Sequence, residues 1–374
     1  MQRLILCLAV LAAALYGIPS ALATDGSSPG PTRLSQASDG FPFQWQGAAH
    51  IALVLPLNSP DFRRAAEMVR QGFLVAAGMP AERPLPTRVY ATDADSEGTL
   101  LAYQDALRNG ASVVVGPLTR DGVATLAASG LVQVPTLALN MIDARGALLP
   151  SELYFFGLSI EAEAQQLARL AHAPDRTRAY VVSSGSPLAN RIRDAFTAAW
   201  EALGGTVAGE LLPMAVGPEL WPELRRQVAG SDAVALLAME FDRARLIRPY
   251  IDPAVPVYAT SLVNQGGGAA FGSHDLNGVR FVDMPWLLAP QRPPASLYPR
   301  PDTSVGVDLE RLYALGIDAY RLALEVVRLP APGAVAVDGV TGDITLTPRQ
   351  QFQRDLMPAE FFGGTARPLG DTGR

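Results

Sequence analysis

The stretch from Val113 to Asn140, VVVGPLTRDGVATLAASGLVQVPTLALN, constrains the fold more than any other part of this sequence. Two apolar runs, VVV and VPTLAL, flank a short helical pattern in it. Apolar runs without polar alternation are typical of strands buried on both faces, as in a parallel sheet covered by helices. Ligands of such sheets bind beyond the carboxyl ends of the strands. We therefore expect Gly116, Thr119 and Asn140 to lie at the functional edge of a sheet.

From His50 onward the sequence alternates strand-like and helix-like segments in two series, which meet near residue 158. The second series includes helices expected over Leu220–Val228 and Asp242–Tyr250 and strands expected over Ala233–Met239 and Val257–Ala259. Strands that alternate with helices of this size are typical of βαβ units around a parallel sheet. The sequence therefore predicts an α/β protein with two doubly wound parallel-sheet lobes and an interlobe cleft.

The expected domain order follows from these two series and from the composition of the ends of the chain. We expect a signal peptide over 1–23, a flexible linker rich in Ser, Gly and Pro over 24–48, the two-lobed domain over 49–364, and a tail over 365–374. The chain returns to both lobes late, so lobe 1 is expected to comprise about 49–158 plus 284–330, and lobe 2 about 159–283 plus 331–364.

The first residues have the three parts of a secretory signal. Arg3 is basic, Leu4 to Ile18 are mostly apolar, and Ala21-Leu22-Ala23 is a small-x-small cleavage pattern, which predicts export to the periplasm and cleavage near Thr24. The apolar run is shorter than the ~20 residues of a spanning helix, so no transmembrane segment is expected in the mature chain. The only cysteine, Cys7, lies inside this run rather than in a lipobox, so we expect no lipid anchor.

Composition excludes several kinds of chemistry. All 30 basic residues are arginine, so the chain has no P-loop lysine and no Schiff-base lysine. The three histidines, His50, His172 and His274, lack a metal-type partner four residues away. We expect no catalytic residue, no metal and no cofactor. The 36 acidic residues give a net charge of −6 without any basic run, so nucleic acid is not an expected partner.

Polar side chains follow most of the predicted strands and are the candidates for a ligand site in the cleft. They are Asn58, Ser59, Gly116, Thr119, Arg120, Asn140, Ser159, Ser183, Ser184, Ser186, Glu240, Ser261 and Asn264. Hydroxyl and amide groups at strand ends can hold a small polar ligand through hydrogen bonds. The same residue types also cap the helices that follow strands. Both interpretations stay open at this point.

Several segments carry a resemblance to a known family. They read IALVLPL, AAEMVRQGFLVA, VVVGPLTRDGVATLA, VPTLALN, YFFGLSIEAEAQQLA, YALGIDAYRLAL and DGVTGDITL. Spread from His50 to Gly364, they resemble the LpoA/LppC-type penicillin-binding protein activators, which have the type I periplasmic-binding-protein fold. The resemblance implies a non-catalytic periplasmic protein that activates a bifunctional penicillin-binding protein, a peptidoglycan synthase, by contact.

The N-terminal end differs from what the resemblance implies. Family members are typically outer-membrane lipoproteins with an additional helical-repeat domain, whereas we expect neither a lipid anchor nor repeats here, because no lipobox cysteine and no repeat-length segment come before His50 in this sequence.

The competing hypothesis is a solute-binding receptor of the ABC-transporter type for a small polar ligand. Carriers of branched-chain amino acids with this fold place a Tyr-Gly pair after the first strand of the second lobe. Here the comparable stretch is Ser186-Pro187-Leu188-Ala189. This difference weakens the hypothesis that the protein carries an amino acid, but it does not exclude another ligand.

Overall fold

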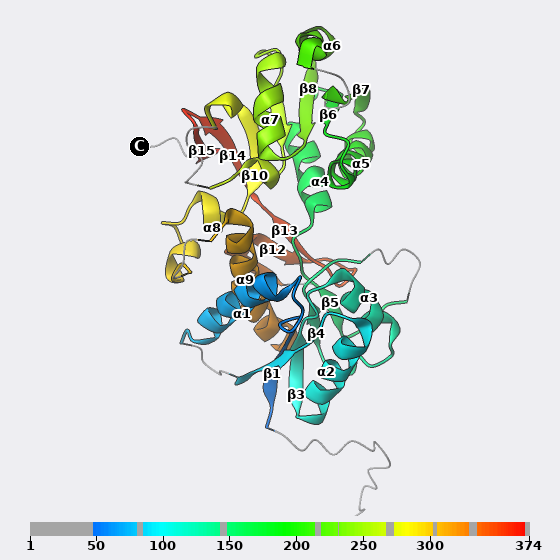
Figure 1. Cartoon of the computed structure of the whole chain (residues 1–374), viewed down its shortest axis with the longest axis vertical. Helices are drawn as coiled ribbons and strands as arrows, with labels where there is room; N and C mark the ends of the chain where they lie inside the picture. The colour runs from blue at the N-terminus through cyan, green and yellow to red at the C-terminus, as the bar shows by residue number, and fades with distance from the viewer. Residues whose placement is uncertain are drawn as a thin grey trace, which may run out of the picture. The chain divides into compact units, whose positions relative to one another are not determined.

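The computed structural model describes residues 48–80, 85–142, 148–213, 218–230, 232–266, 273–301, 305–328 and 335–370 (Figure 1). The predicted signal peptide and all but the last residue of the predicted linker lie outside the described residues. None of the helices in the described ranges is both long enough and apolar enough to span a membrane.

The first sheet has five parallel strands in the order β2-β1-β3-β4-β5. The strands are β1 (His50–Leu55), β2 (Thr87–Ala91), β3 (Ala111–Val115), β4 (Thr136–Ala138) and β5 (Leu153–Phe155). Its helices are α1 (Arg63–Ala77), α2 (Ser96–Arg108), α3 (Arg120–Ala128) and α9 (Val307–Arg328). Leu53 packs in the apolar cluster of α1 and α9, while Val54 packs in the cluster of α2 on the other face. This sheet is therefore doubly wound, as the unbroken apolar runs predict.

The second sheet has seven strands in the order β15-β14-β10-β9-β8-β6-β7. Five are parallel: β6 (Arg178–Ser183), β7 (Thr206–Leu211), β8 (Ala233–Ala238), β9 (Val257–Ala259) and β10 (Val279–Asp283). Strands β14 (Met357–Phe362) and β15 (Thr365–Pro368) form an antiparallel hairpin at one edge. Helices α4 (Ile160–Ala171) and α5 (Pro187–Ala202) bury Val181 on one face, and α7 (Phe241–Ile247) shares a cluster with Val182 on the other.

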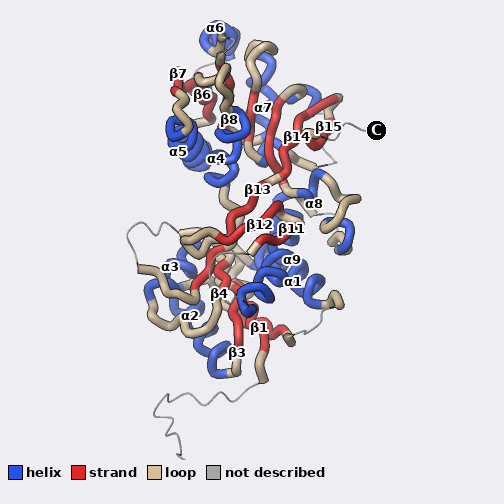
Figure 2. Tube along the Cα trace, turned by 180° about the vertical axis from the view of Figure 1, so that it is seen from behind, coloured by secondary structure: helices blue, strands red, loops and turns tan. Residues whose placement is uncertain are grey.

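A third, antiparallel sheet is formed by β11 (Ala336–Gly339), β12 (Gly342–Leu346) and β13 (Phe352–Asp355) (Figure 2). It contacts the first sheet through a bridge between Phe155 and Gln351, and it contacts α9 through Asp318, which accepts hydrogen bonds from the backbone of Val340 and Thr341. These strands were expected in lobe 2. The bridge and these hydrogen bonds join the third sheet to lobe 1 elements, while β13 also contacts α4 of the second sheet.

The end of the chain also differs from expectation. Residues 365–374 were expected to be a tail, but Thr365–Pro368 form β15, which pairs with β14 from Ala359 to Phe362. The turn Gly363-Gly364, with φ of +58° and +74°, connects the two strands. Positive φ is a conformation that glycine adopts without strain, so the GG pair is the sequence signal for this hairpin.

Prolines account for the two helices that are shorter than the apolar pattern predicts. The helix expected over Leu220–Val228 is a 3-10 helix, Pro218–Glu223, followed by the single turn α6 (Leu224–Gln227). The helix expected over Asp242–Tyr250 becomes 3-10 at Arg248–Tyr250. Pro222 and Pro249 lie in these segments and lack the N–H that an α-helix requires.

Two glycines bring helices α1 and α9 into close contact. A Cβ atom on Gly72 would lie 1.9 Å from the carbonyl oxygen of Tyr313, and one on Gly316 would lie 2.1 Å from that of Val69. The two helix backbones therefore touch at these positions. The same helix, α9, contacts the second sheet through Arg311 in its second turn.

Candidate functional site

Three of the predicted site residues cap helices. Thr119 caps α3, Ser159 caps α4 and Ser186 caps α5. Each hydroxyl oxygen accepts a hydrogen bond from the backbone N–H three residues on, at 3.2, 3.2 and 3.1 Å respectively. Capping, the alternative interpretation of these residues, therefore describes what their side chains do in this structure.

The other candidates at the first sheet also interact within the protein. Asn140 donates from Nδ2 to the carbonyl of Leu118 at 2.9 Å, and the carbonyl of Ser59 accepts from the first residue of α1. Gly116 is required by geometry, because a Cβ there would lie 2.1 Å from the carbonyl oxygen of Val54 and its φ is +112°. Asn58 and Arg120 are exposed, so they remain available to a partner or ligand.

In the second sheet, the serine loop after β6 is also occupied internally. The Ser183 hydroxyl accepts from the backbone N–H of Gly185 at 3.1 Å, and Ser184 donates to the hydroxyl of Ser186 at 3.3 Å. Glu240 precedes α7 without capping it and is partly exposed.

The structure brings Ser261 and Asn264 together around a buried ion pair. Arg311, from the second turn of α9, donates from Nη2 to Asp283 Oδ2 at 2.8 Å and to the carbonyl oxygens of Ser261 and Asn264 at 3.0 and 3.1 Å. Asn264 also donates to Asp283 at 2.8 Å. The side chains of Arg311 and Asp283 are 8% and 1% exposed, so the pair is desolvated and each charge depends on the other.

This polar cluster joins the two lobes. Arg311 belongs to the helix that covers the first sheet, while Asp283 ends β10 and the other two residues follow β9 of the second sheet. The sequence pattern gave no signal for Arg311, because charged residues of a helix are normally expected on its solvent face. Asp283 could have been predicted, since it ends a buried strand, which is the position that identified the other candidates.

A buried carboxylate extends the cluster. Glu163, in the first turn of α4, accepts a hydrogen bond from the backbone N–H of Ser261 at 2.9 Å. Burial raises the pKa of Glu163 to about 7, and the hydrogen bonds from Ser261 oppose this shift only in part. Asp318 is also fully buried but is well satisfied, since it accepts from Thr341 through both N–H and hydroxyl and pairs with Arg321 at 3.0 Å.

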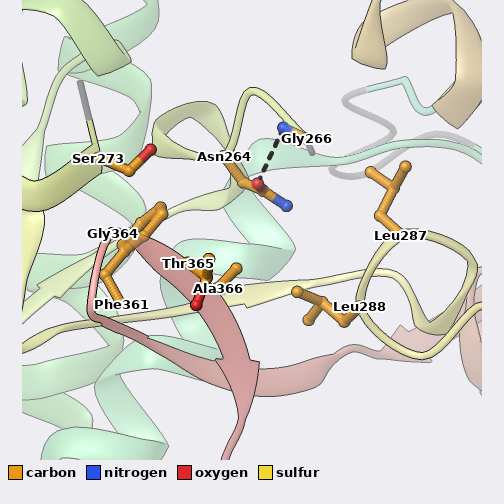
Figure 3. A pocket seen from close by; sticks show the side chains of 9 residues that line it. All are labelled: Asn264, Gly266, Ser273, Leu287, Leu288, Phe361, Gly364, Thr365 and Ala366. Atoms are coloured by element: carbon orange, nitrogen blue, oxygen red, sulfur yellow. Dashed lines mark hydrogen bonds between the residues drawn. The ribbon is translucent and has the colours of Figure 1, made fainter. Parts of the chain in front are cut away.

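Beside Asn264 lies a cavity of about 160 Å³ (Figure 3). The Asn264 amide oxygen accepts a hydrogen bond from the backbone N–H of Gly266 at 3.0 Å. The side chains of Leu287 and Leu288 form an apolar part of the cavity wall. None of the described lining residues is charged. The cavity therefore suits a neutral group, and Asn264 is the one predicted candidate that lines it.

Among the described residues, no group of three or more His, Cys, Asp or Glu side chains is arranged to hold a metal ion. The carboxylate of Asp283 is instead held by an arginine.

The curated proteins that this chain resembles include several penicillin-binding protein activators. The penicillin-binding protein activator LpoA of Photobacterium profundum is 27% identical over 363 residues, which cover 86% of this chain and 57% of that protein. LpoA of Edwardsiella piscicida is 27% identical over 330 residues, covering 75% of this chain and 46% of that protein. The chain thus spans about half the length of these curated relatives.

Solved structures share the fold. A Chromobacterium violaceum protein, titled "a putative branched-chain amino acid ABC transporter", is 37% identical with a TM-score of 0.72, over 84% of this chain and 100% of that one. The C-domain of LpoA from Haemophilus influenzae, titled a regulator of PBP1A, is 24% identical with a TM-score of 0.71, over 86% of this chain and 100% of that domain. The predicted type I periplasmic-binding-protein fold is confirmed.

The family assignment rests on a match along almost the whole described chain. Residues 31–213 and 214–364 match the family described as "LppC putative lipoprotein". The resemblance found in the sequence motifs is therefore confirmed, and the chain belongs to the LppC family.

Proposed function

We propose that this protein is a non-catalytic regulator of peptidoglycan synthesis that activates a bifunctional penicillin-binding protein by contact. The observation that carries the proposal is the continuous family match over residues 31–364, together with curated relatives named penicillin-binding protein activators. Membership of the family also indicates a location in the cell envelope.

The geometry of the polar cluster supports contact rather than ligand-driven hinge closure. The strand ends at which a solute receptor would hold its ligand are occupied by Arg311, Asp283 and Asn264, which bond to each other. Breaking a buried ion pair costs about 3–5 kcal/mol, so this link opposes relative movement of the two lobes. A fixed two-lobed body suits a protein that presents one surface to a partner.

The direct test is a peptidoglycan synthesis assay with purified components. Cognate bifunctional synthases receive increasing amounts of the mature chain, and glycan polymerisation and peptide cross-linking are followed separately. We expect one of the two rates to rise and to saturate with the amount added, as binding requires. Addition of the heat-unfolded chain is the control. Unchanged rates with every cognate synthase would contradict the proposal.

The second candidate function is a solute-binding receptor, favoured by the 37% identity to a protein titled as an ABC transporter. A ligand that binds only the folded state raises its stability, so a thermal-shift screen of amino acids, sugars and muropeptides tests this function. A strong stabilising ligand without any effect on a synthase would favour the receptor.

We further propose that the protein acts in the periplasm after cleavage of residues 1–23. Cell fractionation and N-terminal sequencing of the mature protein test this. A mature chain that starts near Thr24 and is released with the soluble periplasmic fraction is the expected result. A chain retained in membranes would contradict it.

A further inference from the structure

A second cavity, of about 190 Å³, lies between the first turn of α4 and strand β13. It has room for about six water molecules at ~30 Å³ each, or for a small organic ligand. Its wall includes Ser159, Glu163, Gln353 and Arg354. Two of these four side chains, Glu163 and Arg354, carry a charge although they are almost fully buried, a position that charged residues rarely occupy unless they are paired.

The first buried charge is Glu163, which is 7% exposed. Ser261 satisfies part of its carboxylate, but none of the salt bridges among the described residues includes Glu163. A buried carboxylate without a counter-ion is costly, and this cost is what raises its pKa to about 7.

The second buried charge is Arg354, also 7% exposed. It donates to two backbone carbonyls, from Nε to Gly157 at 3.2 Å and from Nη1 to Thr341 at 3.3 Å. It too takes part in no salt bridge among the described residues, and burial lowers its pKa. A guanidinium presents five N–H donors, so Arg354 keeps donors beyond those two bonds.

The neighbouring charges are already matched with one another. Arg311 pairs with Asp283, Arg321 pairs with Asp318, and Glu161 at the cavity pairs with Arg191 at 2.7 Å. Glu163 and Arg354 are therefore the buried charges of this region that have no direct partner, and both line one cavity. They attract each other electrostatically, but no hydrogen bond or salt bridge joins them.

We propose that this cavity binds a small zwitterion, an α-amino acid whose ammonium group pairs with Glu163 and whose carboxylate pairs with Arg354. Such a ligand gives each buried charge a partner of the opposite sign. Gln353 supplies a neutral hydrogen-bonding group beside it. The site lies at the contact of α4 with β13, away from the cavity beside Asn264, and goes beyond the proposed activation of a synthase.

Isothermal titration of the complete mature chain tests the proposal without any synthase. Glycine and L-alanine are compared with ethylamine and propionate, which each carry one of the two charges. We expect the amino acids to bind, and the singly charged compounds to bind at least about tenfold more weakly, because a charged hydrogen bond is lost. No heat of binding at millimolar amino acid, or equal binding of the singly charged compounds, would overturn the proposal.

Variants locate the site. Glu163→Gln and Arg354→Gln are each expected to weaken amino-acid binding about tenfold or more. Arg169→Gln is the matched control, since it alters an exposed pair on the same helix and neither Arg169 nor Asp355 lines the cavity, and it should leave the affinity within about twofold. Loss of binding in the control as large as in the two variants would place the ligand elsewhere.

A further measurement keeps the proposal testable if Arg354→Gln fails to fold. An ammonium beside Glu163 stabilises the ionised carboxylate, so binding near pH 7 should release about half a proton per ligand. Titration in buffers of different ionisation heat measures this release in the unaltered chain. The absence of proton release would contradict the pairing of the ammonium with Glu163.

Discussion

At the scale of single residues, Glu163 makes stability depend on pH. Its pKa is about 7 in the folded chain against 4.5 as the ordinary value, so the folded state binds more protons in between. Stability therefore falls as pH rises from about 4.5 to about 7, by up to ~3 kcal/mol, and levels off above that range. Glu163→Gln should remove this slope and be more stable than the unaltered chain at pH 8, as measured by urea unfolding across the range. Parallel slopes in the two proteins would contradict this.

Arg311 is the residue whose loss should cost most in the polar cluster. Arg311→Met leaves Asp283 buried and unpaired, so we expect a loss of about 3–5 kcal/mol in the free energy of unfolding. Adding Asp283→Leu should recover much of this loss, because the unpaired charge is then gone. Arg169→Gln is the control: its pair with Asp355 is exposed and should be worth less than about 1 kcal/mol.

The same residues show where sequence-based prediction of the site stops. Ser261 and Asn264 could be predicted because they follow a buried strand. Arg311 and Glu163 could not, since each lies on a helix whose polar residues are ordinarily exposed, and only the packing of that helix buries them. The other buried charges of this region come from other elements, Asp283 from β10 and Arg354 from β13, and local patterns carry no signal of such long-range proximity.

At the scale of elements, the contact between α1 and α9 depends on two glycines. Gly316→Ala would place a Cβ about 2 Å from the carbonyl oxygen of Val69, so the helices must separate. We expect a loss of about 3 kcal/mol or more, above the usual range for overpacking because the obstacle is backbone. Thermal unfolding measures it, with Gly306→Ala as the control, because nothing lies within 4 Å of that position. Equal stability of both variants would contradict the close contact.

The hairpin β14–β15 completes the second sheet although it comes last in the chain. A variant that ends at Asp355 would leave β10 as an exposed edge and uncover the stacked ring of Phe281. We expect this variant to aggregate and to unfold without cooperativity, since open edges pair with other chains. A variant that ends at Gly370 is the control and should stay monodisperse in size-exclusion chromatography. A well-folded Asp355 variant would contradict the expectation.

Strands and helices were predicted correctly where one hydrophobic pattern extended over the whole element. Buried strands such as Ala233–Ala238 and Val257–Ala259 follow from unbroken apolar runs, and their boundaries agree within a residue. The hairpin β14–β15 was missed because its short strands carry prolines at Pro358 and Pro368, which argue against a strand in sequence. Pro368 is tolerated because β15 is an edge strand.

At the scale of the whole molecule, two observations decide between regulator and receptor. Family membership favours the regulator, while the amino-acid site proposed at Glu163 and Arg354 favours a role for a small ligand. The two roles can be separated by adding an amino acid to the synthase assay. If ligand binding in the cavity does not affect activation, we expect the same synthase activity with and without glycine or alanine. An altered activity that disappears in Glu163→Gln would instead show that the ligand controls activation.

The path of the chain through its sheets sets the order in which it can fold. Strand β1 is made early, but α9, which covers one face of that sheet, begins at Val307. Contacts so far apart in sequence form slowly, and during synthesis the apolar face with Ile51 and Leu53 is covered only by α1 until α9 has been made. The first sheet receives α9 only after β6 to β10 of the second sheet have been made, and the second sheet is completed last, by β14 and β15. We therefore expect the nascent chain to need a chaperone that holds it unfolded until its last hundred or so residues have appeared.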